Sequence, residues 1–514
     1  MKGEDTGRER FDPGEVPDRG EDPCGVVFGN VGSAQFRCAI SDRDLKEMDY
    51  VEAHHPTDGW VLCQIDSIEL KSDLTIEEAV LKLHGIDEDF SWKRIARVNV
   101  IGRRNQNGML IRPLTPILPS SRIFRPREEF IKNILGLTLE REDGAYIGKI
   151  FHTDVDVILE PSKLVQNHVS IVAKSGSGKS YTCGILIEEL SRLGIPVVIL
   201  DLHGEYGTLV SPNIDSGEYE RMERFGVSPE GLGETVREFT FGANDGSDGR
   251  PISLGLDISG FRTEDLLEMM GVKNIGAGTS ILYNALNRAR DVLGDDYDLN
   301  DVLAIVEADH NPMKWNVANG LSHLLSMPMF TIPRTPLTEV VRKGVVSIIE
   351  MTDVPLDVQQ IGICALLRRL FAARKDGTIP PFMLIVEEAH NFCPQSGPSI
   401  TSRVMKSIAS EGRKFGMGLT IVTQRPAKVD KNVLSQCGTQ IIMKVTNPND
   451  LKAVISSVEG LDSRMAYEIQ RLPVSVGIVV GGNVMNPILV EMRIRRTRHG
   501  GEAVDILHDL KRRN

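Results

Sequence analysis

Residues 168–196 read HVSIVAKSGSGKSYTCGILIEELSRLGIP, and this stretch decides the fold. The apolar run from Val169 to Ala173 predicts a buried strand, and an amphipathic helix begins at Lys179 and ends before Gly194 and Pro196. A glycine-rich loop joins the strand to the helix. This order is typical of a phosphate-binding P-loop, because free backbone N–H groups and the positive end of the helix then point to one place.

The loop residues predict how a nucleotide is held. Gly176 and Gly178 let the backbone N–H groups turn toward the phosphates, Lys179 reaches the β- and γ-phosphates, and Ser180 holds Mg²⁺. Ala173 stands where this motif usually has its first glycine, so only the entry into the loop departs from the pattern. The predicted nucleotide-binding residues are Ser175, Gly176, Ser177, Gly178, Lys179, Ser180 and Tyr181.

A second motif, PPFMLIVEEAHNF at residues 380–392, supplies two carboxylates. Its apolar run predicts a buried strand from Phe382 that ends in Glu387 and Glu388. At such a tip one carboxylate can hold the Mg²⁺ shell and the other can orient and deprotonate the attacking water. We assign Glu387 to the metal and Glu388 to the water. The alternative is a pair of ordinary exposed acids, and the upstream P-loop favours the catalytic interpretation.

A third motif, EGRKFGMGLTIVTQRP at residues 411–426, predicts a helix end followed by a strand. The strand ends at Gln424, which we expect between the acid-bearing strand and the nucleotide, where its amide senses the γ-phosphate. Arg413 lies at the end of the preceding helix and is a candidate arginine finger for a neighbouring subunit. The alternative role for Arg413 is to complement the helix dipole.

Composition limits the possible partners and compartments. The 71 acidic and 59 basic residues give a net charge of -12, so a polyanion must meet a local basic site. Seven cysteines, odd in number and never spaced as C-x-x-C, indicate a reducing cytoplasm and argue against disulfides or structural zinc. Two uncharged stretches, 315–333 and 472–490, contain prolines or paired glycines, so we expect soluble core segments and no membrane partner.

The motifs together resemble one family. AKSGSGKS, VVILDLHGEYG, LIVEEAHNF, EGRKFGMGLTIVTQRP and the C-terminal RIRRTRHGG are similar to the HerA family of hexameric DNA translocases in the HerA/FtsK superfamily. The N-terminal RPLTPILP and the strands before it resemble the HAS barrel of that family. The resemblance covers about residues 24–505.

The resemblance implies a RecA-like ATPase core in a hexameric ring around double-stranded DNA, with ATP and Mg²⁺ between subunits. It also implies the NurA nuclease as a partner and DNA end resection for recombinational repair beside the Mre/Rad end-processing complex. The family's P-loop lysine falls on Lys179, its catalytic glutamate on Glu388 and its trans-acting arginine on Arg413.

Two further segments match the family without a settled role. Asp201, His203 and Glu205 belong to the family's D-x-H-G-E-Y segment, and we expect them at the tip of the strand next to the P-loop strand, in a structural or water-positioning role. The basic segment Arg493, Arg495, Arg496 and Arg498 could line a DNA groove or form a solvated face. Because the family's C-terminal segment braces the adjacent subunit, we favour an intersubunit or nucleotide-contacting role, with Arg493, Arg495 and Thr497 alternating on a strand.

The alternation of strands and helices from Phe130 onward predicts an α/β fold: a RecA-like P-loop NTPase core with a helical insertion, after a small HAS-like β-barrel. We also expect short helices at 76–84 and 503–513. The predicted domains are a disordered acidic tail (1–22), the barrel (23–128), the ATPase core (129–258 and 344–486), the helical insertion (259–343) and a C-terminal intersubunit brace (487–514).

Three functions remain open from the sequence. The first is an ATP-driven translocase or helicase on double-stranded DNA. The second is a protein-remodelling or secretion-type ring ATPase that grips polypeptide, and the third is a nucleotide-binding scaffold that hydrolyses slowly. The complete catalytic set argues against the scaffold, and the lack of a membrane anchor or a recognisable aromatic pore motif argues against the second.

Overall fold

A computed structural model describes residues 22–74, 76, 83, 91–242, 251–258, 261–271, 276–294, 297–397, 399–458, 461 and 463–501. The chain divides into two compact units, Met1–Thr138 with His152–Val155, and Leu139–Phe151 with Asp156–Asn514. The first unit therefore ends ten residues beyond the predicted boundary at 128. The predicted tail before residue 22, most of the predicted helix 76–84, and the helix 503–513 lie outside the described residues.

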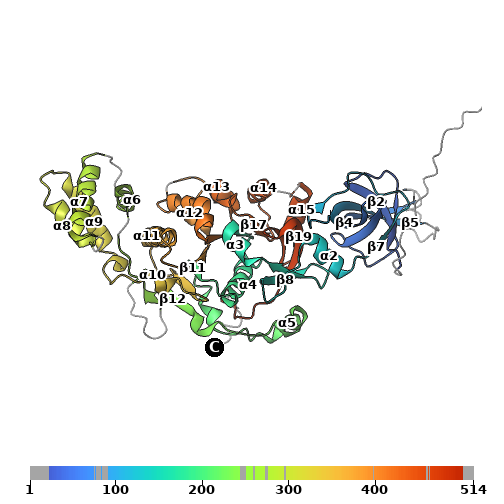
Figure 1. Ribbon diagram of the computed structural model, residues 1–514, viewed down its shortest axis with the longest axis horizontal. Coiled ribbons are helices and arrows are strands. Elements are labelled where there is room, and N and C mark those ends of the chain that lie inside the picture. Colours follow the sequence, from blue (N-terminus) through green and yellow to red (C-terminus); the bar gives the residue numbers. More distant parts are fainter. Residues whose placement is uncertain are drawn as a thin grey trace, which may run out of the picture. The chain divides into compact units, whose positions relative to one another are not determined.

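The first unit is a small β-barrel (Figure 1). Its strands run in the order β2-β1-β7-β3-β4-β5, and pairing between β2 and β5 closes the six-stranded ring. In β2, residues Phe36, Cys38 and Ile40 are buried while their neighbours face outward, so period-two alternation builds the barrel core. The predicted barrel is confirmed. Its elements are β1 (Gly25–Phe28), β2 (Gln35–Ile40), β3 (Tyr50–His55), β4 (Gly59–Ser72), β5 (Trp92–Arg104), β6 (Leu110–Ile111), β7 (Arg122–Phe124) and α2 (Glu128–Leu135).

The second unit is built on a twelve-stranded sheet with the order β13-β12-β14-β11-β15-β16-β10-β17-β18-β19-β8-β9. The strands from β13 to β17 are parallel, and the remaining four continue the sheet antiparallel. The predicted α/β fold is confirmed. The strands are β8 (Ala145–Ile150), β9 (Asp156–Leu159), β10 (Val169–Val172), β11 (Val197–Asp201), β12 (Val236–Thr240), β13 (Ile252–Ser253), β14 (Val346–Glu350), β15 (Phe382–Val386), β16 (Met417–Thr423), β17 (Thr439–Ile442), β18 (Val476–Gly481) and β19 (Val484–Met492).

Helices cover both faces of this sheet, with α11 and α12 on one side and α4 on the other (Figure 1). Burial of nearly continuous apolar strands such as β15 requires this two-sided cover. The helices outside the insertion are α3 (Pro161–Asn167), α4 (Lys179–Arg192), α5 (Tyr219–Phe225), α11 (Leu356–Lys375), α12 (Ser402–Phe415), α13 (Lys431–Leu434), α14 (Pro448–Ser457) and α15 (Ser463–Arg471).

The register brings three strand ends to one edge of the sheet. Val172, the last residue of β10, pairs with Thr423, the last residue of β16, and β15 ends beside β16 with Val386 opposite Ile421. Because the strands are parallel, the segments after β10, β15 and β16 all leave from this carboxyl edge, where ligands bind in open α/β sheets. The three predicted motifs therefore meet there.

One expected neighbour relation is wrong. The strand that ends in Asp201, β11, pairs with β14 and β15 and does not lie next to β10. Both β15 and β16 lie between β11 and the P-loop strand. Consecutive strands are usually neighbours, but here the connection after β10 crosses over two strands that come later in the sequence.

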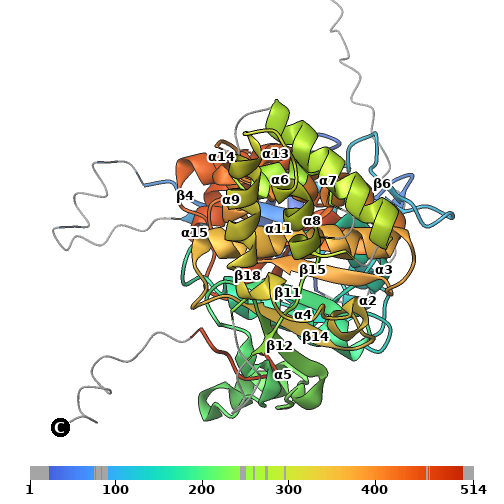
Figure 2. The same cartoon turned by 90° about the vertical axis from the view of Figure 1, so that its left-hand side faces the viewer.

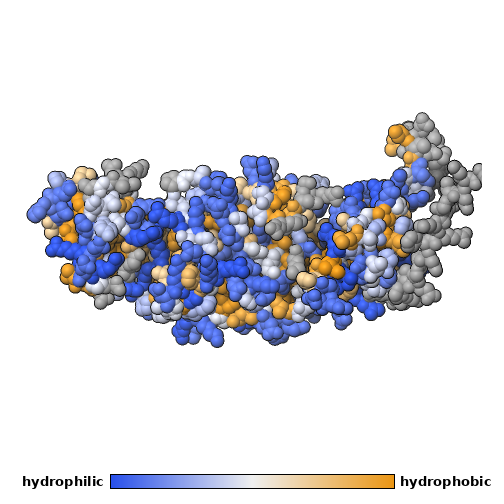
Figure 3. Space-filling view, turned by 45° about the horizontal axis from the view of Figure 1, so that its top comes forward, coloured by the Kyte–Doolittle hydropathy of each residue, from blue (hydrophilic) through white to orange (hydrophobic). Residues whose placement is uncertain are grey.

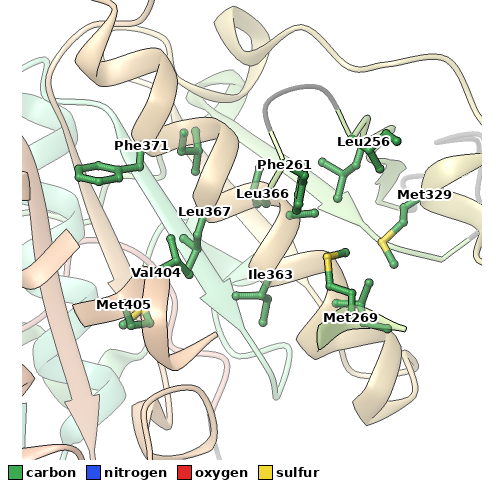
Figure 4. Close-up of a cluster of buried hydrophobic side chains, with 14 of the residues drawn as sticks. Leu256, Phe261, Met269, Met329, Ile363, Leu366, Leu367, Phe371, Val404 and Met405 are labelled. Atoms are coloured by element: carbon green, nitrogen blue, oxygen red, sulfur yellow. The ribbon is translucent and has the colours of Figure 1, made fainter. Parts of the chain in front are cut away.

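The insertion is helical as expected and packs on α11 (Figure 2). Figure 4 shows Phe261 and Met269 close to Leu366 and Ile363 of α11, so apolar contacts join the insertion to the core. The buried carboxylate of Asp265 adds an ion pair to α11 through Arg368, at 2.6 Å. The insertion helices are α6 (Thr263–Met269), α7 (Ala277–Leu293), α8 (Leu299–Glu307), α9 (Lys314–Leu325) and α10 (Leu337–Val340).

Among the described residues, no helix combines the length and the apolarity needed to span a bilayer. On the face in Figure 3, hydrophobic residues form several small areas among hydrophilic ones. Both uncharged stretches singled out in the sequence supply pieces of this second unit, α9 from the first and β18 and β19 from the second.

Candidate nucleotide site

The loop between β10 and α4 has the geometry that its glycines predict. Gly176 and Gly178 have φ angles of +73° and +96°, which residues other than glycine rarely adopt. Ala173 is fully buried, and its N–H donates to the carbonyl of Thr423 at 3.3 Å, so alanine is accommodated at the loop entry. Lys179 begins α4, which places the positive helix end directly behind the loop.

Lys179 is the centre of the candidate site. Its Nζ lies 2.7 Å from Oε1 of Glu388 and 3.8 Å from Oε1 of Glu387. Burial alone would lower the pKa of Lys179, but the two carboxylates outweigh it and raise that pKa. The structure thus brings together three residues assigned from two separate motifs. A triphosphate at this loop would have to compete with Glu388 for the ammonium group.

Glu387 is the buried member of the acidic pair. Burial raises its pKa to about 7, against the effects of Lys179 and of the Tyr206 hydroxyl, which donates to Oε1 at 2.8 Å. Its Oε2 is buried and has no hydrogen-bond partner among the described residues. A buried carboxylate oxygen with a free lone pair fits a hard divalent cation such as Mg²⁺, with Ser180 in the first turn of α4 as the second protein ligand.

Glu388 is held in an uncommon backbone conformation. Its φ and ψ angles of 43° and 46° are left-handed, which costs a non-glycine residue roughly 1–3 kcal/mol and is typical of functional sites. The 3-10 helix η6 (Ala389–Asn391) follows at once. In it, Nδ1 of His390 lies 3.3 Å from Oε2 of Glu388 and 3.4 Å from Oγ1 of Thr423, so His390 links the proposed catalytic carboxylate to the end of β16.

Asp201 has a structural role. Its carboxylate accepts the backbone N–H groups of residues 203 to 206 at 2.9 to 3.3 Å. This folds the segment after β11 so that Tyr206, which is fully buried, reaches Glu387. Glu205 contributes through charge, since it raises the pKa of both Lys179 and Glu387, and His203 is exposed.

Sequence reasoning missed Tyr206 and His390. Both stand inside motifs already quoted, DLHGEYG and EEAHNF, but their roles depend on contacts across strands. Only the strand order shows that Tyr206 faces Glu387 and that His390 faces Thr423. The sole sequence signal was their position directly beside the acidic residues.

We expect Tyr206→Phe to raise the Mg²⁺ concentration required for half-maximal ATP turnover about tenfold, because outer-shell hydrogen bonds orient metal-binding carboxylates. The measurement is a Mg²⁺ titration of turnover at saturating ATP. Tyr219→Phe is the matched control, since Tyr219 is exposed at the start of α5. An unchanged Mg²⁺ requirement in Tyr206→Phe would contradict the assignment of Glu387 to the metal.

Gln424 and Arg413 lie at opposite ends of β16. Gln424 follows the last residue of β16, and β16 runs between β15 and β10. Arg413 is exposed in the last turn of α12, before β16 begins, and its side chain has no hydrogen bond or ion pair with another described residue. Seven residues of strand span about 20 Å, so Arg413 lies far from Lys179 of its own chain.

The C-terminal arginines differ from expectation. The strand β19 ends at Met492, so Arg493 and Arg495 do not alternate on it. Both side chains are 0% exposed, which excludes them from a DNA groove or a subunit surface. Arg493 instead pairs with two glutamates of α4, Glu188 at 2.8 Å and Glu189 at 2.9 Å.

This buried cluster anchors the chain's end to its own P-loop helix. Burial would raise the pKa of Glu188, but Arg493, Arg495 and hydrogen bonds from Thr497 lower it. Tyr181 joins the cluster, because its hydroxyl accepts the backbone N–H of Arg495 at 2.9 Å. The Tyr181 hydroxyl is therefore engaged here, and the half-buried ring and the backbone remain for the predicted nucleotide contact.

Arg493→Met should destabilise the second unit by about 3 kcal/mol, the lower end of the range for breaking a buried ion pair, because Glu188 keeps only Arg495 at 3.6 Å and Glu189 keeps only Arg192 at 2.8 Å. The expected result is a large fall in the melting temperature. Thermal unfolding monitored by circular dichroism measures it. Arg498→Met is the control, since Arg498 is exposed and should leave the melting temperature nearly unchanged. Equal effects of the two substitutions would show that the buried pairing contributes little.

Known proteins of similar sequence include helicases. Residues 145–370 match the family described as "Helicase HerA, central domain". A probable helicase of Methanocaldococcus jannaschii is 25% identical over 493 residues, covering 89% of this chain and 88% of the relative. The DNA double-strand break repair helicase HerA of Saccharolobus solfataricus is 27% identical over 419 residues, covering 79% of each chain.

The solved structures that match this chain share little sequence with it. VirB4 of Thermoanaerobacter pseudethanolicus has a TM-score of 0.49 at 12% identity, covering 68% of this chain and 96% of VirB4. The plasmid coupling protein TrwB with an ATP analogue has a TM-score of 0.47 at 12% identity, covering 72% and 93%. The resemblance stated from the motifs agrees with this match: residues 145–370 are similar to the family described as "Helicase HerA, central domain".

Proposed function

We propose that this protein is an ATP-hydrolysing motor that translocates along double-stranded DNA or unwinds it. The observation that carries the proposal is the 2.7 Å contact between Lys179 Nζ and Glu388 Oε1 beneath the P-loop. The names of the HerA relatives, which describe DNA break repair helicases, support DNA as the substrate over polypeptide.

Each catalytic residue then has one task. Lys179 leaves Glu388 to bind the β- and γ-phosphates, and the freed Glu388 orients the attacking water and takes its proton. Glu387 and Ser180 would hold Mg²⁺, and the bound ion would neutralise charge on the phosphates. Gln424 lies at the end of β16 and senses the γ-phosphate, while the loop N–H groups around Gly176 bind the phosphate oxygens.

The motor works as a ring of identical subunits, and we propose a hexamer. Arg413 supports this, because it lies at the amino edge of the sheet, remote from its own Lys179, and can complete only a neighbour's site. A ring also explains how a chain of net charge -12 holds DNA, since each subunit adds a few local phosphate contacts and the contacts act together.

The cellular role that we propose is resection of DNA ends for recombinational repair in the cytoplasm. In this role the ring feeds DNA to the NurA nuclease and works beside the Mre/Rad complex. Co-purification of this chain with NurA, followed by degradation of linear duplex DNA only when ATP and both proteins are present, is the expected result. Failure of the pair to associate would remove NurA from the proposal.

The basic test compares ATP turnover with and without linear duplex DNA at low salt. We expect DNA to stimulate turnover several-fold, and a single-stranded or closed circular DNA of equal mass serves as the comparison. A ring that hydrolyses ATP but responds to an unfolded polypeptide rather than to DNA would favour the protein-remodelling alternative. Absence of any stimulation by DNA would contradict translocation.

A further inference from the structure

A hollow of the second unit lies between η7 (Pro426–Lys428), α13 and α14. Its volume is about 460 Å³, and a second hollow of about 350 Å³ adjoins it. The two share Lys452 and Ser456, so they form one continuous groove over α14, which we call the lysine groove. Figure 1 shows α13 beside α12.

The lysine groove is basic in an acidic chain. Residues 425–457 contain five basic and two acidic residues, whereas the whole chain has net charge -12. Both acids are engaged: Asp430 pairs with Lys406 at 2.8 Å, and Asp450 accepts the N–H of Ala427 at 3.1 Å. Lys431 and Lys452, which line the groove, are exposed and have no ion-pair partner among the described residues.

Part of the uncharged lining can donate hydrogen bonds to phosphate groups. Asn432, Asn449 and Ser456 present amide and hydroxyl groups beside the two lysines. Lysine together with Asn and Ser side chains is the set that proteins use to contact phosphate oxygens of nucleic acids without reading sequence. Apolar side chains such as Val429 and Leu434 also line the groove, so the two lysines and these polar groups are the part that can contact a DNA backbone.

The two segments that border the groove, η7 and α14, each follow a segment that contacts the nucleotide site. On one side of the groove, η7 begins at Pro426, two residues after Gln424. The wall formed by α14 follows the segment whose Lys444 carbonyl accepts the N–H of Lys174 in the P-loop at 2.8 Å. Asp450 joins the two walls through Ala427. A shift at the γ-phosphate therefore reaches the groove through a few bonded residues.

We propose that the lysine groove binds the phosphate backbone of duplex DNA, with Lys431 and Lys452 as the phosphate contacts. This inference rests on the proposed DNA motor and names its DNA-gripping surface. Because η7 continues from the γ-phosphate sensor Gln424, the groove tightens or loosens its hold with the state of the nucleotide. Repetition around a ring multiplies the small contribution of each groove.

The test is the double variant Lys431→Ala/Lys452→Ala in the full chain. The slope of log affinity for a fluorescent duplex against log salt concentration should become shallower by about two per engaged subunit, because each phosphate contact releases about one counterion. DNA stimulation of ATP turnover should fall about tenfold or more. Turnover without DNA should stay at the wild-type level, because neither lysine belongs to the catalytic site.

The control is Arg342→Ala/Lys343→Ala, which removes the same charge from exposed residues just before β14, at the opposite sheet edge. Its salt slope should match wild type, and Lys431→Arg/Lys452→Arg should retain DNA stimulation. An unchanged slope in the alanine variant would overturn the groove. So would a fall in particle mass, which would make the groove a subunit contact. If the wild-type protein neither binds duplex DNA nor shows DNA-stimulated ATP turnover, the proposed function is contradicted, and not only the assignment of the groove.

Discussion

Arg413→Ala is expected to lower ATP turnover by about 10³- to 10⁵-fold, the range known for arginine fingers. The exposed Arg413 side chain has no hydrogen bond or ion pair with another described residue, so its loss should not destabilise the chain. About 20 Å of β16 separates it from the carboxyl edge of its own sheet. The effect must therefore act on the nucleotide of an adjoining subunit.

Mixed rings test this directly. A subunit with Arg413→Ala keeps a working Lys179, and a subunit with Lys179→Ala keeps a working Arg413. Where they meet in the right order, one complete site forms, so a mixture should hydrolyse ATP faster than either variant alone. Turnover that never exceeds the sum of the two variants would show that Arg413 does not act in trans. Lys414→Ala, beside Arg413 and also exposed, is the control and should retain most activity.

The parts of this structure that could be predicted from the sequence are local. Strand, loop and helix follow one another within residues 168–196, so the P-loop needs no distant partner to be recognised. The apolar run before Glu387 likewise predicts a buried strand, and β15 is buried along its whole length. Parallel strands bring their carboxyl ends together, which places Lys179 beside Glu388.

The parts that could not be predicted depend on strand order and on distant pairing. The order places β15 and β16 between β10 and β11, and no local pattern encodes that crossover. The arginines at 493 and 495 look like a surface patch, because only the folded chain shows Glu188 and Glu189 opposite them. The partners are about 300 residues away, on a helix whose glutamates look solvent-facing in isolation.

Glu388→Gln should lower ATP turnover by about 10²- to 10⁴-fold, the contribution of a general base, while ATP still binds. Glutamine keeps the size of the side chain but cannot accept the proton of the attacking water. The same change removes the charge that holds Lys179 at 2.7 Å, so the lysine is freed for the phosphates and ATP affinity should stay equal or increase. The measurements are steady-state turnover and binding of a fluorescent ATP analogue.

Glu387→Gln separates the two carboxylates. Because we assign Glu387 to Mg²⁺, its substitution should raise the Mg²⁺ requirement as well as lower turnover, whereas Glu388→Gln should leave that requirement near the wild-type value. The contacts of the two carboxylates are the physical reason for the difference: Glu387 is oriented by the Tyr206 hydroxyl, whereas both oxygens of Glu388 face basic groups, Lys179 at 2.7 Å and His390 at 3.3 Å. Normal hydrolysis by Glu388→Gln would contradict its role as the general base. The reverse pattern of Mg²⁺ dependence would exchange the two assignments.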